Sequence, residues 1–334
     1  MREIYRDRNR PQAGNLTYAY ILLICIICWI TGYVRSVGVP VYGSVTAAPL
    51  WNMICQVLTD QLPVYLIGML FTVGGAFVLY RMNYVMVLIR EKTLLPFLLY
   101  VLFISTNPDF FPLKSTTLSV FCMIFAINEL FKSYHDENST SNAFNVAFIF
   151  GLGSLLWAQI AFFLPAFWIG MYNFRSLNLR NFGASLLGFV SVYWFVLGWC
   201  VWQNDYSPFT IPFNSIYTFQ FTGLEGQSLV DWIAPLLIAF MTFLASANIL
   251  THENEDNLRT RQFLSFLIML SVWSFALFFT HQESPEEYME IVCVPTSILI
   301  AHFFTVRHGK LYYWSLHLFI LALIALFIMQ LWNF

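Results

Sequence analysis

Four charged residues between positions 35 and 114 have the types and spacing that chemistry at a membrane surface would use. Asp60 and Asp109 are carboxylates that could act as general acid and base or coordinate a cation. Arg35 and Lys114 are bases that could hold a phosphate, and each shares a connection with one of the acids or lies directly beside it. The alternative is that the acids only solvate the surface, while Arg35 extends its charge outward from a helix end. The sequence leaves both readings open.

Stronger signatures of catalysis or metal binding are lacking in the sequence. It has no GxSxG, HExxH or Walker motif. A metal site needs three or four converging donors, and we interpret each histidine as a buried side chain satisfied in one tautomer. We interpret the cysteines as small core hydrophobes. We therefore expect no cofactor and no metal, with a divalent cation only if the two acids are catalytic. These residues are His135, His252, His281, His302, His308 and His317, and Cys25, Cys28, Cys55, Cys122, Cys200 and Cys293.

The composition indicates the surroundings in which these residues must be held. Hydrophobic residues make up 59% of the 334 residues, charged residues only 10%, and the mean hydropathy is +0.67. A soluble domain has about 25% charged residues, so lipid must cover much of this chain. The net charge of −2 argues against nucleic acid as a partner, because no basic surface could neutralise a phosphate backbone.

Apolar segments that could cross a bilayer recur along the whole chain. A spanning helix needs about 20 apolar residues. The stretch 141–174 is too long for one span and is interrupted by glycine and proline, so we expect a hairpin of two short helices there. We expect the first segment to be retained rather than cleaved as a signal, with Thr46-Ala47-Ala48 as the alternative cleavage region. The segments outside the hairpin lie near 18–34, 63–80, 93–106, 115–133, 183–203, 231–250, 263–280, 289–306 and 311–332.

The basic residues predict how these segments alternate, because Lys and Arg collect in cytoplasmic loops. If the hairpin crosses twice, 14 of the 16 basic residues lie inside and only Arg35 and Lys114 lie outside. We therefore predict an all-α polytopic transmembrane bundle of about 11 spans in the inner (cytoplasmic) membrane, with the N-terminus cytoplasmic and the C-terminus outside. We expect residues 1–334 to form one membrane domain that begins with a basic tail, 1–17. The inner residues are Arg2, Arg6, Arg8, Arg10, Arg81, Arg90, Lys92, Lys132, Arg175, Arg180, Arg259, Arg261, Arg307 and Lys310.

Three outer connections have distinctive compositions. Residues 38–62 are expected to contain an interfacial helix over 47–60 with an apolar face. Residues 204–230 form an aromatic loop that we expect to fold back onto the outer surface, and 281–290 form an acidic loop. We expect envelope proteins to dock on the last two loops. The apolar face of the interfacial helix comprises Leu50, Ile54, Val57 and Leu58.

Ionisable residues inside predicted spans are the usual candidates for transport chemistry, and they are few here. Glu129 and Lys132 are three residues apart on one helix, so we expect an interfacial salt bridge between them. Glu290 and His302 lie twelve residues apart on one span, about 18 Å along the helix axis, and cannot act together. The shortage of acids at mid-membrane makes a transporter the third choice.

Four sequence stretches in the middle of the chain follow the pattern glycine, span, proline, span, basic loop, span. With the arginines before the first span and the interfacial helix after it, this pattern resembles the GT-C superfamily of polyprenyl-phosphate-sugar-dependent glycosyltransferases over roughly residues 15–205. The chain is also similar to a group of multi-pass inner-membrane proteins from Bacteroidota. The stretches are Phe148-Ile149-Phe150-Gly151-Leu152-Gly153-Ser154-Leu155-Leu156-Trp157, Phe162-Phe163-Leu164-Pro165-Ala166-Phe167-Trp168, Asn173-Phe174-Arg175 and Leu187-Gly188-Phe189.

The resemblance implies two functions, because one feature departs from it. Active GT-C members have an acid early in the first outer loop, whereas Asp60 is late and no acid precedes it there. If Asp60 has taken that role, the resemblance implies a lipid-linked-sugar-dependent glycosyltransferase with Asp60 and Asp109 as catalytic residues and Arg35 and Lys114 as substrate contacts. Otherwise the chain is a non-catalytic or degenerate GT-C-like subunit or scaffold, which is the function we expect. The expected small partners are membrane lipids, including polyprenyl-phosphate-linked glycan.

Overall fold

The computed structural model consists of helices. It describes residues 15–36, 48–107, 110–210, 212, 229–252, 256–280, 285–307 and 309–333, and no strand occurs among them. The all-α prediction is confirmed, and seven helices in these ranges are long and apolar enough to cross a membrane. The elements are α1 (Asn15–Ser36), α2 (Pro49–Val57), α3 (Gln61–Met86), α4 (Leu95–Ser105), α5 (Ser115–Lys132), α6 (Thr140–Ser154), η3 (Ala158–Phe163), α7 (Leu164–Asn173), α8 (Leu179–Gln203), α10 (Leu229–Thr251), α11 (Leu258–Thr280), α12 (Pro285–Val306) and α13 (Lys310–Asn333).

A helix occupies each apolar segment that the sequence assigns to a span. The predicted hairpin over 141–174 consists of α6 and α7, which the 3-10 helix η3 connects. However, α4, α6 and α7 have only 11, 15 and 10 residues, whereas a bilayer core requires about 17 or more. The positions of the helices are therefore confirmed, and the number of membrane crossings stays a prediction.

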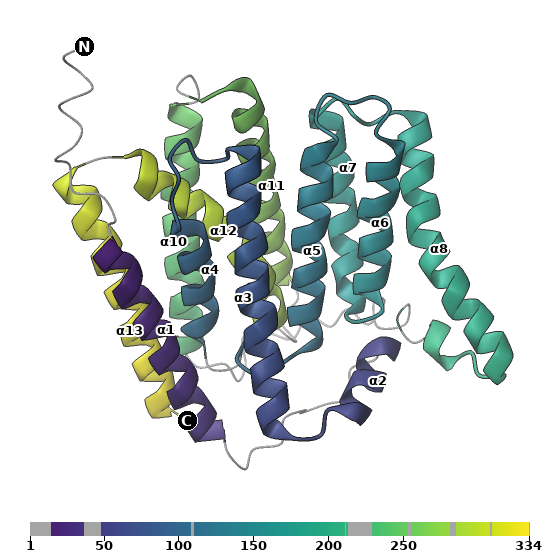
Figure 1. Ribbon diagram of the computed structural model, residues 1–334, viewed down its shortest axis with the longest axis horizontal. Coiled ribbons are helices and arrows are strands. Elements are labelled where there is room, and N and C mark those ends of the chain that lie inside the picture. Colours follow the sequence, from purple (N-terminus) through teal and green to yellow (C-terminus); the bar gives the residue numbers. More distant parts are fainter. Residues whose placement is uncertain are drawn as a thin grey trace.

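The connections that the sequence assigns to the inner side meet at one end of the bundle. Arg90, between α3 and α4, forms an ion pair with Asp256, between α10 and α11, with an N–O distance of 2.9 Å. The amide of His135, between α5 and α6, donates to the carbonyl of Phe174, between α7 and α8, at 3.0 Å. Figure 1 shows these connections at the end where α1 begins, which we call the inner end, while α2 lies at the opposite, outer end. Which end faces the cytoplasm stays a prediction.

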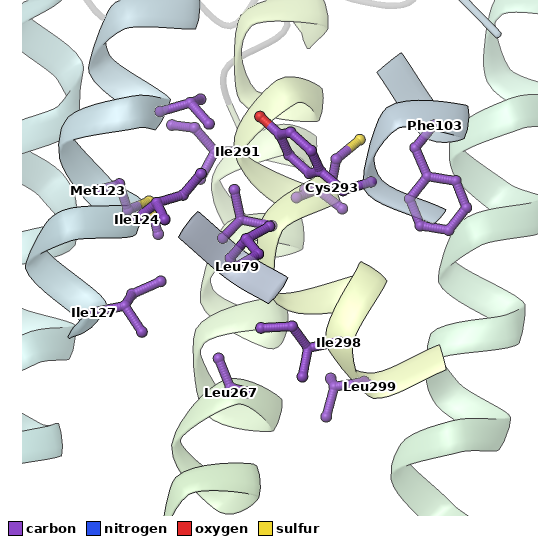
Figure 2. Packing of buried hydrophobic residues seen from close by; sticks show 14 of the residues in the cluster. Leu79, Phe103, Met123, Ile124, Ile127, Leu267, Ile291, Cys293, Ile298 and Leu299 are labelled. Atoms are coloured by element: carbon purple, nitrogen blue, oxygen red, sulfur yellow. The ribbon is translucent and has the colours of Figure 1, made fainter. Parts of the chain in front are cut away.

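Helices α4, α5, α10, α11 and α13 pack against α12. Of its most apolar 18 residues, 89% are buried, against 28–44% in the other six candidate spans. Its sequence from Ile291 to Ala301 has apolar or small side chains on every face, as expected of a helix with protein on all sides. Figure 2 shows side chains of α12 among those of α3, α4, α5 and α11. The labelled residues are Ile291, Cys293, Ile298 and Leu299 of α12, with Leu79, Phe103, Met123, Ile124, Ile127 and Leu267 around them.

Two glycines allow the segment after α4 to lie directly against α1 and α3. A Cβ atom at Gly32 would lie 2.0 Å from the Phe111 ring, and one at Gly68 would lie 2.7 Å from the Phe111 carbonyl oxygen. The Leu113 amide donates to the Val64 carbonyl at 3.3 Å, which attaches the same segment to the first turn of α3. This packing holds the end of α1 and the starts of α3 and α5 together at the outer end.

The helix predicted over 47–60 is confirmed as α2, with one difference on its apolar face. Leu50, Ile54 and Leu58 are partly buried and pack against the core, as expected. Val57 is 81% exposed, so its assignment to this face was wrong. The helix ends at Val57, and Leu58 leaves the helical conformation, with φ −101° and ψ 85°. Leu58 rather than Val57 therefore covers the core, and the interfacial position of α2 stays a prediction.

Two outer loops differ from expectation or lie outside the described residues. Residues 285–290 belong to α12, so the predicted acidic loop 281–290 was wrong in its second half. The helix begins early because a proline and two acids in the first turn favour a helix N-terminus. Of the aromatic loop 204–230, residues 211 and 213–228 are outside the described residues. The described Phe209 lies edge-on to Tyr193 of α8, with 6.3 Å between ring centroids.

Three smaller predictions about side chains have different outcomes. Glu129 and Lys132 form the expected ion pair at the inner end of α5. Of the cysteines expected in the core, four are buried, whereas Cys55 and Cys122 are only partly buried. Of the histidines expected to be buried, His302 is buried, but His135 and His252 are exposed, so the prediction was wrong for these two.

Replacing Gly188 by alanine is expected to destabilise the bundle. A Cβ atom there would lie 2.4 Å from the Phe144 carbonyl oxygen on α6, so α6 and α8 would have to separate. Overpacking of this kind costs about 1–3 kcal/mol. Gly183 on the same helix has open space around it, so Gly183→Ala is the matched control and should be neutral or slightly stabilising. Thermal unfolding of the two variants in one detergent measures the difference, and equal midpoints would contradict the close contact.

The predicted orientation can be tested at the two ends of α8. Leu179 and Gln203 are both exposed, and Cys55 is replaced by serine to lower the background. In intact cells, a membrane-impermeant maleimide should label Gln203→Cys and should label Leu179→Cys only after permeabilisation. The reverse pattern would invert the topology, and labelling of both cysteines in intact cells would show that α8 does not cross.

Candidate functional site

Two of the predicted site residues lie at the outer end on neighbouring helices. Arg35 is exposed on the last turn of α1, and Asp60 is exposed directly before α3. The rings of Tyr33 and Tyr65 meet edge to face, with 5.4 Å between centroids, so these two helix ends are adjacent. Asp109 lies outside the described residues. The catalytic and binding roles predicted for these residues stay predictions.

Lys114, the fourth candidate, is paired with an acid that the sequence analysis did not choose. It is partly buried directly before α5, and its Nζ lies 3.4 Å from Oε2 of Glu286, in the first turn of α12. Exposed ion pairs of this kind stabilise by about 0–1 kcal/mol. A phosphate that approached Lys114 would have to compete with this carboxylate.

A second acid of α12, Glu290, is buried beside the start of α5. Only 2% of Glu290 is exposed. The Thr117 hydroxyl donates to its Oε2 at 3.3 Å, and its Oε1 has no hydrogen-bond partner among the described residues. Burial disfavours a negative charge at this position, and the positive Lys114 and the N-terminal end of the α5 dipole act in the opposite direction. A buried carboxylate without such partners would be strongly destabilising, so this contact requires α5 and α12 to stay together.

A third acid links α12 to the segment before η3. The Trp157 indole donates to Oε2 of Glu287 at 2.7 Å. The same indole packs edge-on against Tyr288, with 5.0 Å between ring centroids. We call the three acids Glu286, Glu287 and Glu290, with Lys114, Thr117 and Trp157, the outer polar cluster.

The local sequence explains why these acids converge. Pro285 begins α12, and Glu286 and Glu287 occupy its first turn, where negative charge is favourable. Glu290 follows them by four and three residues, so all three acids project from neighbouring positions on the helix. The face that carries them is turned toward α5 and η3.

A separate group of ionisable residues lies at the inner end. Asp256 accepts from Nε of Arg90 at 2.9 Å, and its other oxygen lies 3.4 Å from Nε2 of His302 on α12. Burial raises the pKa of Asp256, but the hydrogen bond from His302 and the charges of His302 and Arg90 outweigh burial, so the pKa is lowered overall. Beside this group, Nε of Arg307 donates to the Asn248 side chain at 3.0 Å. These contacts attach the C-terminal end of α12 to the connection between α10 and α11 and to the last turns of α10.

In both groups, the ionisable side chains connect one helix or connection to another. In the outer polar cluster each acid contacts a donor on another helix or segment. Within the described ranges, no three His, Cys, Asp or Glu residues are arranged to hold a metal ion. As expected, Glu290 and His302 do not interact, since each has its own partner at opposite ends of α12.

Sequence reasoning missed Glu286, Glu287 and Asp256. The proline followed by acids at 286, 287 and 290 is a helix-start signal that could have moved the beginning of α12 forward. Their partners could not be found in the same way, because Lys114 and Glu286 are 172 residues apart. For Asp256, which lies in a short polar connection, no sequence signal distinguished it from its neighbours.

Comparison with known proteins gives one family. The model of a family described as "Family of unknown function (DUF6427)" matches residues 36–334. No curated protein matches the chain, and no solved structure matches it.

Removing the Thr117 hydroxyl tests the contact between α5 and α12. Thr117→Val keeps the shape but leaves Glu290 without its donor, which should cost about 1–3 kcal/mol of stability. Thr296→Val is the control, because the buried Thr296 hydroxyl donates within its own helix, to the Val292 carbonyl at 2.7 Å. Thermal unfolding in detergent should rank Thr117→Val as the less stable variant. An equal loss in both would mean that Glu290 does not depend on Thr117.

Proposed function

The chain belongs to the DUF6427 family, and we propose that it is a non-catalytic membrane subunit that holds other proteins of an envelope complex in place. Its membrane would be the inner, cytoplasmic membrane, which the distribution of basic residues favours. The observation that carries the proposal is the outer polar cluster. The acids gathered there contact donors of the same chain, so they stabilise the bundle rather than face a substrate.

The rest of the bundle is consistent with a rigid support. α12 is buried along its length and is attached near each end through ionisable side chains. Such attachments oppose the sliding or tilting of a central helix that alternating access would need. The structure therefore supports a scaffold better than a transporter.

Protein partners would contact the outer surface. Of the loops expected to bind partners, 204–230 and 281–290, the described residues 204–210 follow α8 and 285–290 begin α12, and the exposed Asp60 adds negative charge beside α2. The apolar side chains that α8 leaves exposed include four aromatic residues over two turns and a half, which suit contact with lipid or with another membrane helix. These are Trp194, Phe195, Trp199 and Trp202.

The alternative function is a lipid-linked-sugar-dependent glycosyltransferase that acts at the outer leaflet. Asp60 favours it, because this carboxylate is exposed at the outer end and no ion pair joins it to another described residue. Asp60 and Asp109 would then be the acid and base, and Arg35 would contact the phosphate. Because Lys114 is paired with Glu286, it would contribute less than Arg35 to binding the phosphate.

The two functions differ in their dependence on the predicted catalytic acids. In a strain that lacks the chromosomal copy, the double variant Asp60→Asn, Asp109→Asn should support growth and envelope integrity as well as the natural chain does. The complex should also migrate unchanged on a native gel. The reason is that a scaffold does not use these carboxylates for proton transfer.

Loss of complementation with an unchanged native-gel band would contradict the scaffold and favour the enzyme. Membranes that contain the natural chain would then be supplied with a polyprenyl-phosphate sugar donor, and transfer that the double variant lacks would establish the alternative. Thr117→Val is the matched control for simple loss of folding, because it weakens the bundle without changing Asp60 or Asp109.

A further inference from the structure

An apolar groove runs between α1 and α13 at the outer end. Its volume is about 410 Å³, within the ~300–1,000 Å³ range of small-molecule pockets. Ile30 and Val34 of α1 and Ile328 of α13 are 58%, 64% and 51% exposed, so the groove opens outward, toward lipid in a bilayer. The described residues that line it are Ile30, Thr31, Val34, Arg35, Ile328 and Leu331.

Among the described residues that line this groove, Arg35 is the only charged one. The Thr31 hydroxyl donates to carbonyls of its own helix, those of Ile27 and Cys28, both at 2.9 Å. Among the described residues of the groove, the guanidinium of Arg35 is therefore the group that can donate hydrogen bonds to a ligand. It is five residues beyond Ile30 on α1, about 7.5 Å along the helix axis, so the apolar wall extends from the charge into the predicted span.

The charge of Arg35 is available to a ligand. No ion pair joins it to another described residue, whereas Lys114, the other base of the outer end, is paired with Glu286. A planar guanidinium can donate two parallel hydrogen bonds to phosphate oxygens. A cation without an ion pair to any described residue, placed above an apolar groove, is complementary to an anionic headgroup above an acyl chain.

We infer that the groove between α1 and α13 binds one anionic membrane phospholipid, with its phosphate on Arg35 and an acyl chain along Ile30, Val34 and Ile328. The side chains that line the groove argue against a second protein helix as its occupant. Membrane helices associate through small residues that let backbones approach closely, and the groove is lined by branched aliphatic side chains. A flexible chain can fill such a surface without that close approach. This inference does not depend on the proposed function.

The test uses the full chain in nanodiscs of phosphatidylcholine with a small fraction of phosphatidylglycerol, followed by native mass spectrometry after release into detergent. The natural chain should retain one phosphatidylglycerol molecule, and Arg35→Gln should lower its affinity by at least about tenfold, the effect of losing a charged hydrogen bond. Val34→Trp should also release the lipid by filling the groove with no change of charge. Val34 is exposed, so this variant should fold normally.

Arg180→Gln is the matched control, because Arg180 is exposed at the start of α8 and does not line the groove. Diacylglycerol has the same chains without phosphate and should not be retained, and glycerol phosphate in solution should not compete. Equal loss in Arg35→Gln and Arg180→Gln, retention by Val34→Trp, or competition by glycerol phosphate would each overturn the inference. So would a chain dimer that Val34→Trp dissociates, since a second copy would then occupy the groove.

Discussion

The burial of α12 is the constraint on which the rest of the structure depends. A helix that is covered by protein along most of its length can carry ionisable side chains only where partners meet them, because an unpaired buried charge is strongly destabilising. α12 carries two such residues in its buried part, Glu290 and His302. Glu290 accepts a hydrogen bond from Thr117 at the start of α5. His302 contacts Asp256, in the connection between α10 and α11. The helix is thereby attached at both ends to segments that are distant in the sequence.

The same constraint explains how the shorter helices are placed. α4, α6 and α7 are too short to form an independent crossing, yet their side chains belong to the core cluster that α12 enters. A short helix deep in a membrane protein is tolerated where protein rather than lipid satisfies the backbone at its ends. At the turn of the hairpin, the Ser119 hydroxyl donates to the Gly153 carbonyl in the last turn of α6 at 3.1 Å. The Trp273 indole donates to the Phe162 carbonyl in η3 at 3.0 Å. The hairpin can therefore turn inside the bundle.

Most of the helical layout could be predicted from the sequence, because it follows from local signals. Apolar length locates the helices, and the positions of Arg175 and Arg180 require a turn on the same side as Lys132, which gives the hairpin. The candidate site was harder to predict because proximity in the chain was taken as proximity in space. Lys114 follows Asp109 by five positions, but its ammonium contacts Glu286, which only the packing of α12 against α5 brings near. Long-range pairing of this kind leaves no trace in a single sequence.

Charged residues at the outer end have two roles, and which role a residue has depends on whether it is buried or exposed. Where acids lie against other helices, as Glu287 and Glu290 do, they are matched by donors and serve the bundle. The exposed charged groups of Arg35 and Asp60 form no ion pair with a described residue. The Tyr33–Tyr65 contact keeps these two exposed groups on adjacent helix ends. Binding outside the bundle is therefore to be sought at the exposed ends of α1 and α3, rather than among the acids that hold α12.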